Sequence, residues 1–477
     1  MIPILILSAF VLMNPSTTWN DPDTFWHIEL GRTMIQEQTI LREAIHTFTP
    51  NLPYVPHEIG FQLVVGGLYG LWGWKGVHIL TVICLGFMIW GLYRLAKISR
   101  KEMGYEAEHP YLTLIIPVVS LVIFLLYFKI RPQMVSAPIV IWFFVFLREF
   151  QWQPSFLKAL YLGFLSLALS NVHTGVWPLI GVFFMMALLE SAWARNLTKH
   201  HISAMIFILL GGVLNAGGWR TLVYFHTIGK TGFTAFISEW HPIHFNEDTI
   251  FFTIIVLFVW SAMYSARKTI FRFVFMVGIL YLGVANYKQQ LYMELFLIYF
   301  LAIAIDHVPW LNGFKRLDWV VRPSFLRWVF GLGLAVNLIM GWSISYEEPQ
   351  STYPVKEMDY ILEHHAEGRP KVLAPYSSSG YVMFRGGDIL ADGRMDPFII
   401  DETRGVHQWT AFERSMYAYQ SEEIMSIIEF DKPQYVIMPK PKAKDAWGLE
   451  DISYHKIHNT LGEPIFQGDY GEVYQIQ

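Results

Sequence analysis

Charged residues are scarce in this chain. Aspartate, glutamate, lysine and arginine make up 16% of its 477 residues, whereas soluble domains carry about 25%. Hydrophobic residues make up 53%, and the mean hydropathy is +0.35. The net charge of −4 lacks the basic excess that nucleic-acid binding requires. These deficits exclude an ordinary soluble domain and a nucleic-acid-binding protein, and they predict a polytopic protein in the lipid bilayer.

Cysteine is almost absent. The single cysteine, Cys84, lies in an apolar run, which excludes an intramolecular disulfide and a cysteine-based zinc site. No internal repeat or low-complexity tract is visible. The N-terminus, MIPILILSAFVLMNP, lacks the basic region and the small-residue cleavage site of a signal peptide. We expect a retained first span, although its roughly 13 apolar residues fall short of the about 20 that cross a bilayer.

What the chain has is a series of long apolar runs. With the N-terminal segment they predict a mainly α-helical protein, a transmembrane bundle of about eleven spans over residues 1–345 with a first outer loop at 14–74. The other runs lie at about 75–93, 111–128, 133–148, 157–172, 175–193, 202–216, 249–266, 271–286, 289–306 and 325–343.

Basic residues mark one side of this bundle. If the N-terminus is cytoplasmic, the inside loops hold basic clusters within 94–101, 267–272 and 315–327, whereas the longer outside loops hold few basic residues, among them Lys129 and Lys288. The positive-inside rule therefore predicts an integral plasma-membrane (inner-membrane) protein with a cytoplasmic N-terminus.

The tail over residues 346–477 is more charged than the rest of the chain. YPVKEMDYILEHH and EEIMSIIEF carry apolar residues at helical spacing, while KVLAP, DILAD and QYVIMP are typical of short strands. An odd number of spans places the tail outside the cell. We therefore expect a small extracytoplasmic α/β domain.

Polar residues from separate outer loops fall on this same side of the membrane. They are Asp21, Asp23, His27, His57, Glu58, Arg131, His173, Glu239, His241, Lys288 and Gln289. Chance does not favour such a distribution among loops far apart in the chain. We predict that these residues share one external pocket.

The stretch NDPDTFWHIELGR opens the first outer loop. Its apolar residues recur at helical spacing, which predicts a helix in the membrane interface, and HEIGFQLVV predicts a second one with Glu58 in its first turn. In the simplest interpretation Asp23 caps the first helix and Asp21 is solvated. Because His57 and Glu58 lie in the same loop, we favour a chemical role for the two aspartates, either as general base or as ligands of a divalent cation such as Mg²⁺ or Mn²⁺. The sequence leaves that choice open. Glu58 is a further candidate catalytic residue.

Cations at outer helix ends oppose the charge bias. Arg131 precedes a proline, so its backbone leaves the helix, and a guanidinium on such a bend suits bidentate contact with a phosphate. Lys288 lies where a lysine can hold a lipid phosphate. Lys129, two residues before Arg131, is more simply interpreted as a lysine whose side chain snorkels from a helix end to the membrane surface.

Two further outer segments carry candidate residues. NVHTG holds His173, which is either a satisfied structural histidine or part of the pocket. EWHP combines Glu239, Trp240 and His241, although a tryptophan alone would suit the aromatic belt. The glutamate beside it favours a binding role.

The tail contains one more candidate, in DILADGRMDPF. The ordinary interpretation is a turn in which Arg394 pairs with Asp396. The alternative is a turn folded over the membrane pocket.

The order of these motifs resembles a known family. DPDTFWH, HEIGF, RPQ, NVHTG, NAGGW, EWHP and ADGRMDPF are together similar to little-characterised bacterial members of the GT-C superfamily of integral-membrane glycosyltransferases. The resemblance covers nearly the whole chain. It implies an outer active site, a polyprenyl-phosphate-linked sugar donor and an acidic residue of the first outer loop that acts on the acceptor.

The resemblance also implies catalytic roles. Asp21 or Asp23 takes the position of the family's acid, but Pro22 separates residues that are adjacent in many members, so the base stays undecided between them. The family includes metal-dependent and metal-independent members, which leaves the cation undecided too. The sugar would pass to a cell-envelope glycan, a glycolipid or a protein, while Arg131 or Lys288 stabilises the leaving phosphate.

The remaining candidates would hold the substrate. Trp26 and Trp240 are expected to stack on sugar rings. The other expected contacts come from His27, His57, His173, Glu239, His241 and Arg394.

Two other functional classes compete with a transferase. A transporter or flippase of lipid-linked sugars needs polar residues along a path across the bilayer, yet here they concentrate on one side, and Glu294 is the main deep charge. A catalytically inactive scaffold does not explain polar and aromatic residues gathered on one face. The sequence does not identify the sugar, the carrier lipid, the acceptor or the oligomeric state.

Overall fold

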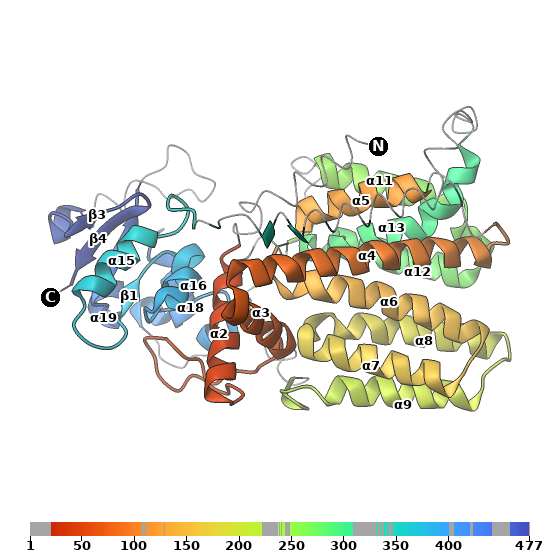
Figure 1. Ribbon diagram of the computed structural model, residues 1–477, viewed down its shortest axis with the longest axis horizontal. Coiled ribbons are helices and arrows are strands. Elements are labelled where there is room, and N and C mark those ends of the chain that lie inside the picture. The colour runs from red at the N-terminus through yellow and green to blue at the C-terminus, as the bar shows by residue number, and fades with distance from the viewer. Residues whose placement is uncertain are drawn as a thin grey trace.

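A computed structural model of the chain describes residues 21–106, 112–127, 129–221, 249–308, 348–399, 405–419, 423–440 and 458–476, with isolated positions between these ranges. Long helices run side by side in one part of the molecule, and a smaller part with a sheet lies at one end of them (Figure 1). Two expected spans, the N-terminal segment and about 325–343, lie wholly or mostly outside the described residues.

The bundle helices coincide with the other predicted spans. They are α4 (Trp74–Glu102), α5 (Leu112–Tyr127), α6 (Pro132–Trp152), α7 (Phe156–Val172), α8 (Trp177–Trp193), α9 (Lys199–Val213), α11 (Thr249–Met263), α12 (Ile270–Ala285) and α13 (Gln290–Ala304). Among the described residues, four segments are long and apolar enough to cross a membrane, namely α4, α6, Thr174–Trp193 and Tyr287–His307. The others are shorter, so the number of spans remains a prediction.

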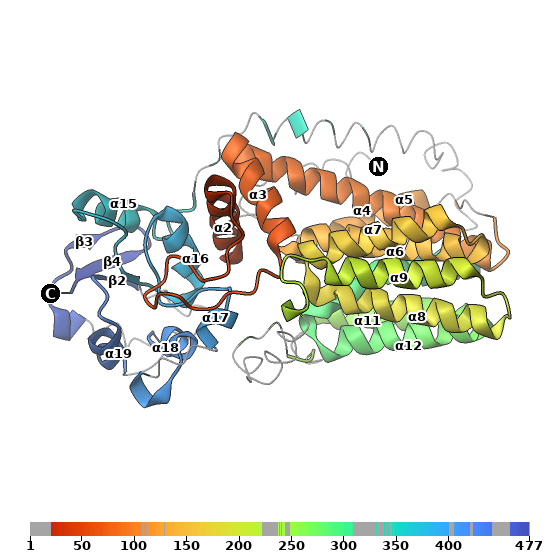
Figure 2. The same ribbon diagram turned by 90° about the horizontal axis from the view of Figure 1, so that it is seen from below.

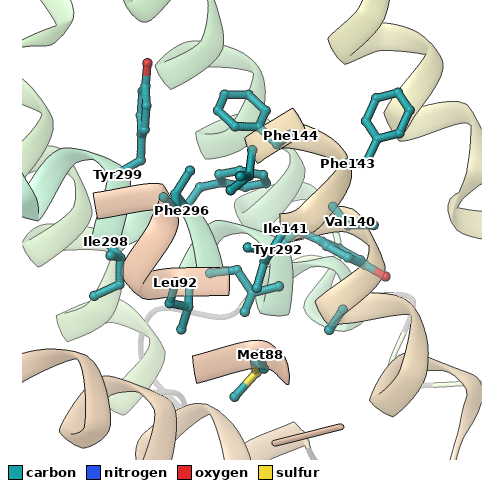
Figure 3. Packing of buried hydrophobic residues seen from close by; sticks show 14 of the residues in the cluster. Met88, Leu92, Val140, Ile141, Phe143, Phe144, Tyr292, Phe296, Ile298 and Tyr299 are labelled. Atoms are coloured by element: carbon teal, nitrogen blue, oxygen red, sulfur yellow. The ribbon is translucent and has the colours of Figure 1, made fainter. Parts of the chain in front are cut away.

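The centre of the bundle is a dry layer of aromatic rings. Every residue of α13 is buried, and its Phe296 lies with the ring centroid 5.0 Å from those of Phe144 on α6 and Phe275 on α12. Figure 3 shows Phe144 and Phe296 packed with aliphatic side chains such as Ile141. Such close packing holds helices together in lipid, where the hydrophobic effect between them is weak.

Two shorter helices lie between the bundle and the small part. The predicted first-loop helices are present as α2 (Asp23–Glu37) and α3 (Ile59–Trp72), and α2 crosses the end of the bundle (Figures 1 and 2). Their backbones touch at a glycine pair, because a Cβ on Gly31 would lie 1.9 Å from the Gln62 carbonyl oxygen and one on Gly66 would lie 2.6 Å from the Arg32 nitrogen. The glycines therefore fix how closely the two helices approach.

The tail forms a small α/β unit around a four-stranded sheet. Its strands are β1 (Val372–Leu373), β2 (Tyr435–Pro439), β3 (Phe466–Gln467) and β4 (Gly471–Gln475), in the order β1-β2-β4-β3, with β1 parallel to β2 and the other pairs antiparallel. Its helices are α15 (Val355–His364), α16 (Tyr376–Arg385), α17 (Asp396–Ile399), α18 (Ala411–Tyr417) and α19 (Ile424–Asp431). The strand expected at DILAD forms only isolated bridges.

The first outer loop is built into the core of this unit. Phe48 donates its backbone N–H to the Ile389 carbonyl at 2.9 Å, and Ile389 donates to the His46 carbonyl at 3.1 Å. The Phe48 side chain joins the same buried cluster as Leu373 and Val436. On the other side of the loop, the Phe25 ring of α2 packs edge-on against Tyr381 of α16 at 4.9 Å. Loop and tail therefore sit together over one end of the bundle.

Candidate active site

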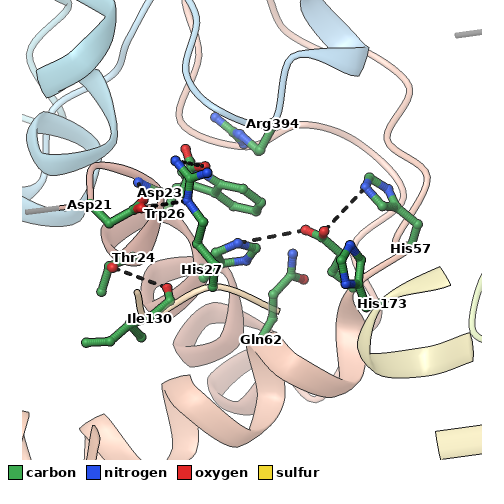
Figure 4. Close-up of polar contacts among 12 residues, drawn as sticks. Asp21, Asp23, Thr24, Trp26, His27, His57, Gln62, Ile130, His173 and Arg394 are labelled. Atoms are coloured by element: carbon green, nitrogen blue, oxygen red, sulfur yellow. Dashed lines mark hydrogen bonds and ion pairs between the residues drawn. The ribbon is translucent and has the colours of Figure 1, made fainter. Parts of the chain in front are cut away.

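A cavity lies where the bundle, the first outer loop and the tail meet. Its volume, including its open mouth, is about 940 Å³. Most of the predicted site residues line it: Asp23, Trp26, His27, His57, Glu58, Arg131, His173, Lys288 and Arg394. Figure 4 shows His27 of α2 facing His57 and His173, with Arg394 above them. Residues from six separate stretches of the chain thus share one pocket.

Three other predicted residues do not line the cavity, and a fourth is not described. Asp21 is fully buried behind the cavity wall, and Glu239 reaches the cavity residues through ion pairs with Arg131 and Lys288. The backbone of His241 accepts a hydrogen bond from Tyr287, and its side chain does not line the cavity. Trp240 lies outside the described residues.

Arg131 is the hub of the charged wall. It precedes Pro132 at the start of α6, in an extended conformation (φ −131°, ψ 164°), as predicted. Its Nε lies 2.6 Å from Asp21 Oδ2, its Nη2 lies 3.1 Å from Asp23 Oδ2, and its Nη1 donates to both oxygens of Glu239 at 2.7 and 2.8 Å. Burial lowers the pKa of Arg131, but the three carboxylates outweigh it and hold this pKa well above its usual value. The site therefore contains a fixed, permanent cation.

The two aspartates have different environments. The expectation that Asp21 is solvated is wrong: it is buried, one oxygen accepts the Asp23 backbone N–H at 3.0 Å, and burial raises its pKa although Arg131 opposes the shift. The capping role of Asp23 is also wrong, since no side chain caps α2. Asp23 instead accepts from Trp26 Nε1 at 3.1 Å and lines the cavity with 23% of its side chain exposed. Of the two aspartates, Asp23 lines the cavity and Asp21 does not.

A histidine–carboxylate group forms the opposite wall. Glu58 lies 3.8 Å from His27 Nε2 and 4.0 Å from His57 Nε2, and His57 Nδ1 lies 3.8 Å from Asp396. Burial, together with positive groups such as Arg131, lowers the pKa of His27 well below its usual value, so this ring is neutral at pH 7. Burial also lowers the pKa of His57, but Asp396 and Glu58 outweigh it and raise the net value. Burial raises the pKa of Glu58.

His173 and Tyr292 complete the floor of the cavity. His173 Nδ1 lies 3.0 Å from Ser136 Oγ, which also lies 3.4 Å from the Tyr292 hydroxyl. Burial, followed by the charge of Lys288, lowers the pKa of His173 well below its usual value. His173 is therefore a hydrogen-bonded, neutral ring that also lines the pocket.

The tail's turn forms the roof. The expected pairing of Arg394 with Asp396 is wrong: Arg394 Nε donates to both oxygens of Asp392 at 2.8 and 3.1 Å, and its Nη1 donates to the Ile45 carbonyl at 3.0 Å. A Cβ on Gly393 would lie 1.9 Å from Asp23 Oδ1, so the turn's backbone touches the aspartate. The alternative interpretation, a turn folded over the pocket, describes the structure.

Some cavity residues were not assigned a site role by the sequence. Asp396 belongs to a motif that drew attention, but it was paired with the wrong partner. Gln133 follows Arg131 in RPQ, and Tyr292 lies one helical turn beyond Lys288. Helical spacing from Lys288 is the signal that could have found Tyr292, and Gln133 belongs to the RPQ motif that the sequence had already singled out.

The arrangement does not fit a divalent cation. Among the described residues, no group of three or more His, Cys, Asp or Glu side chains could hold a metal ion. The two candidate ligands, Asp21 and Asp23, both direct an oxygen toward the Arg131 guanidinium. A metal between them would face a fixed positive charge at short range.

The comparisons with known proteins found similar folds among solved structures. No protein-family model matches the sequence, and no curated protein sequence matches it. The apo structure of ArnT from Cupriavidus metallidurans is similar with a TM-score of 0.54 at 14% identity, over 99% of this chain and 97% of that one. The same protein bound to undecaprenyl phosphate is similar with a TM-score of 0.52 at 13% identity, over the same shares.

A second membrane enzyme shares the arrangement. The oligosaccharyltransferase from Archaeoglobus fulgidus, tethered to an acceptor peptide, is similar with a TM-score of 0.54 at 9% identity, over 92% of this chain and 69% of that one. ArnT and this enzyme are both GT-C membrane glycosyltransferases. The chain has a GT-C-like fold. The expectation of a mainly helical, GT-C-like fold with a small sheet-containing tail is therefore confirmed, while the eleven spans and the side of the membrane on which the tail lies stay predictions.

Proposed function

We propose that the protein is a membrane glycosyltransferase that moves a sugar from a polyprenyl-phosphate-linked donor to an extracytoplasmic acceptor. The observation that carries this proposal is a single cavity in which a fixed guanidinium, Arg131, lies beside an exposed carboxylate, Asp23. The GT-C-like fold around it, and the undecaprenyl phosphate bound to the similar ArnT, support the choice of donor class. The acceptor is a cell-envelope glycan, a glycolipid or a protein.

Asp23 acts as the general base in this mechanism. It removes or orients the proton of an acceptor hydroxyl, which then attacks the anomeric carbon of the sugar. Asp21 cannot reach a substrate, so it holds Arg131 in place from behind. Glu58 also lines the cavity, and because burial raises its pKa it is the alternative base.

Arg131 and Lys288 stabilise the leaving phosphate. Both line the cavity, and charge that develops on the phosphate oxygens is stabilised by cations already in position. On the other wall the neutral rings of His27 and His173 can hydrogen-bond to sugar hydroxyls. Trp26, whose indole N–H is held by Asp23, offers its ring to the sugar.

The interior of the bundle favours a transferase over a transporter. Beyond the cavity lies the dry aromatic layer of Phe144, Phe275 and Phe296. At the other end of α4, Glu102 receives Arg148 Nε at 2.5 Å and Arg272 Nη2 at 3.1 Å, which closes that end with a satisfied ion cluster. A polar path across the bilayer is not formed by the described residues.

The proposal is tested by a transfer assay. Purified protein is offered radiolabelled polyprenyl-phosphate sugars with membrane extract as acceptor, and wild type is compared with Arg131→Ala and with Glu149→Gln, whose carboxylate pairs with Arg94 at the far end of the bundle. We expect label transfer in wild type and Glu149→Gln and its loss in Arg131→Ala. Donor binding without transfer by wild type would favour the transporter or the scaffold.

A further inference from the structure

The carboxylate of Glu239 occupies the space between the two cations of the site. Both of its oxygens accept from Arg131 Nη1, at 2.7 and 2.8 Å, and Oε2 also lies 3.9 Å from Lys288 Nζ. A carboxylate that receives a guanidinium in this way resembles a phosphate, because both present oxygens bearing a shared negative charge. We propose that Glu239 is an internal stand-in for the donor's phosphate, which it must yield when the donor binds. This inference rests on the proposed function.

Arg131, Lys288 and Glu239 are attached to different parts of the fold. Arg131 is held at the start of α6 by Pro132 and by two aspartates, and Lys288 lies in a turn that leads directly into α13. Glu239 comes from the chain between α9 and α11, so it is not mounted on the helices that carry the two cations.

Withdrawal of Glu239 removes one negative charge from this cluster. The ion pairs join three carboxylates to three cations, namely Asp21, Asp23 and Glu239 to Lys129, Arg131 and Lys288. A group that takes the place of Glu239 without changing the net charge must itself carry one negative charge. A phosphodiester carries one negative charge at pH 7, whereas a diphosphate carries at least two. The site therefore suits a sugar linked to its lipid through a single phosphate.

The ionisation state of Glu239 agrees with its proposed role as a stand-in for a phosphate. Burial alone would raise its pKa, but Arg131 and Lys288 outweigh burial and lower it. The carboxylate is therefore ionised at neutral pH, as a phosphate competitor must be. With 29% of its side chain exposed, it also has solvent on one side into which it can move.

The test measures phosphate binding without requiring turnover. The full-length protein in detergent is titrated with farnesyl methyl phosphate, a lipid phosphodiester, and with farnesyl diphosphate. Glu239→Gln removes the competing charge and keeps the size of the side chain, so it should bind the phosphodiester about tenfold more tightly than wild type. Glu239→Asp, which keeps the charge at shorter reach, should fall between the two. Glu149→Gln, the same change in a remote ion pair, should match wild type.

The outcomes separate this inference from the proposed function. Unchanged or weaker binding by Glu239→Gln, in a variant that melts at the wild-type temperature, would overturn the stand-in role. Tighter binding of the diphosphate than of the phosphodiester by wild type would overturn the charge argument. If Arg131→Ala binds the phosphodiester as well as wild type does, the donor site itself is wrongly placed, and the failure lies with the proposed function.

Discussion

At the scale of single residues, Arg131 combines a structural and a chemical task. Its guanidinium faces three carboxylates from two different segments, a geometry that the planar fork of arginine allows and the point charge of lysine does not. Its removal would leave the buried Asp21 with Lys129, 3.8 Å away and 44% exposed, in place of the guanidinium. Both stability and activity therefore depend on this one side chain.

Arg131→Ala should destabilise the protein by about 3–5 kcal/mol, because breaking a buried ion pair leaves an uncompensated charge. Thermal unfolding in detergent measures the effect. Arg94→Ala is the control, since Arg94 is 44% exposed in its pair with Glu149 and an exposed pair contributes about 0–1 kcal/mol. Equal losses in the two variants would show that Arg131 has no special structural role.

His57 should make stability depend on pH. Its net pKa is raised in the folded protein, mainly by Asp396 and Glu58 against the effect of burial. A histidine with a raised pKa contributes stability that is complete below its unfolded value of about 6.5 and is lost as pH rises through its folded value. Wild type should therefore lose stability above about pH 6.5, and Asp396→Asn should lose less.

The comparison is made as unfolding midpoints from about pH 6.5 upward, so that protonation of Glu58 at lower pH does not dominate. Parallel curves for wild type and Asp396→Asn would mean that Asp396 does not set the charge of His57. A smaller slope in the variant is the predicted result.

At the scale of elements, the site depends on how closely α2 and α3 approach. Asp23, Trp26 and His27 lie on α2, while Glu58 directly precedes α3. The contact between the helices runs through glycines whose backbones touch. A change in their separation would move the two walls of the cavity relative to each other.

Gly66→Ala should therefore disrupt the site. Its Cβ would lie 2.6 Å from the Arg32 nitrogen and 2.7 Å from the Gly31 Cα, both backbone atoms that cannot turn away. We expect a loss of about 1–3 kcal/mol in stability together with loss of transfer. Gly70→Ala on the same helix is the control: its Cβ meets nothing within 4 Å, and the gain in helix propensity makes it neutral or slightly stabilising. Full activity in Gly66→Ala would contradict this account.

At the scale of the whole molecule, the helical bundle was the part most open to prediction. Each described bundle helix matches an apolar run, because membrane helices must be continuous and apolar to satisfy their backbones. Arg131 and Lys288 are cations at helix ends that oppose the charge bias. They pointed to the cavity because a charge at the membrane boundary is costly in free energy unless it has a function. Two of the tail's helices, α15 and α19, were also visible as apolar residues at helical spacing, whereas α16, α17 and α18 were not predicted.

Long-range contacts were not open to prediction. The burial of Asp21 depends on Arg131, and the pairing of residue 389 with the first loop is a backbone contact that leaves no local mark in the sequence. Arg394 pairs with Asp392 and not with Asp396, in a position from which its guanidinium also donates to the Ile45 carbonyl of the first outer loop. Such choices are decided by which segments the fold brings together, and not by spacing along the chain.

The central claim is that one cavity, with Asp23 as its base, transfers a sugar from a lipid phosphate. The most direct test is single-turnover transfer from a polyprenyl-phosphate sugar by Asp23→Asn, with donor binding measured on the same sample. The account predicts that the rate of transfer falls by about 10²–10⁴-fold while the donor still binds through Arg131 and Lys288. Transfer at the wild-type rate in Asp23→Asn would contradict it.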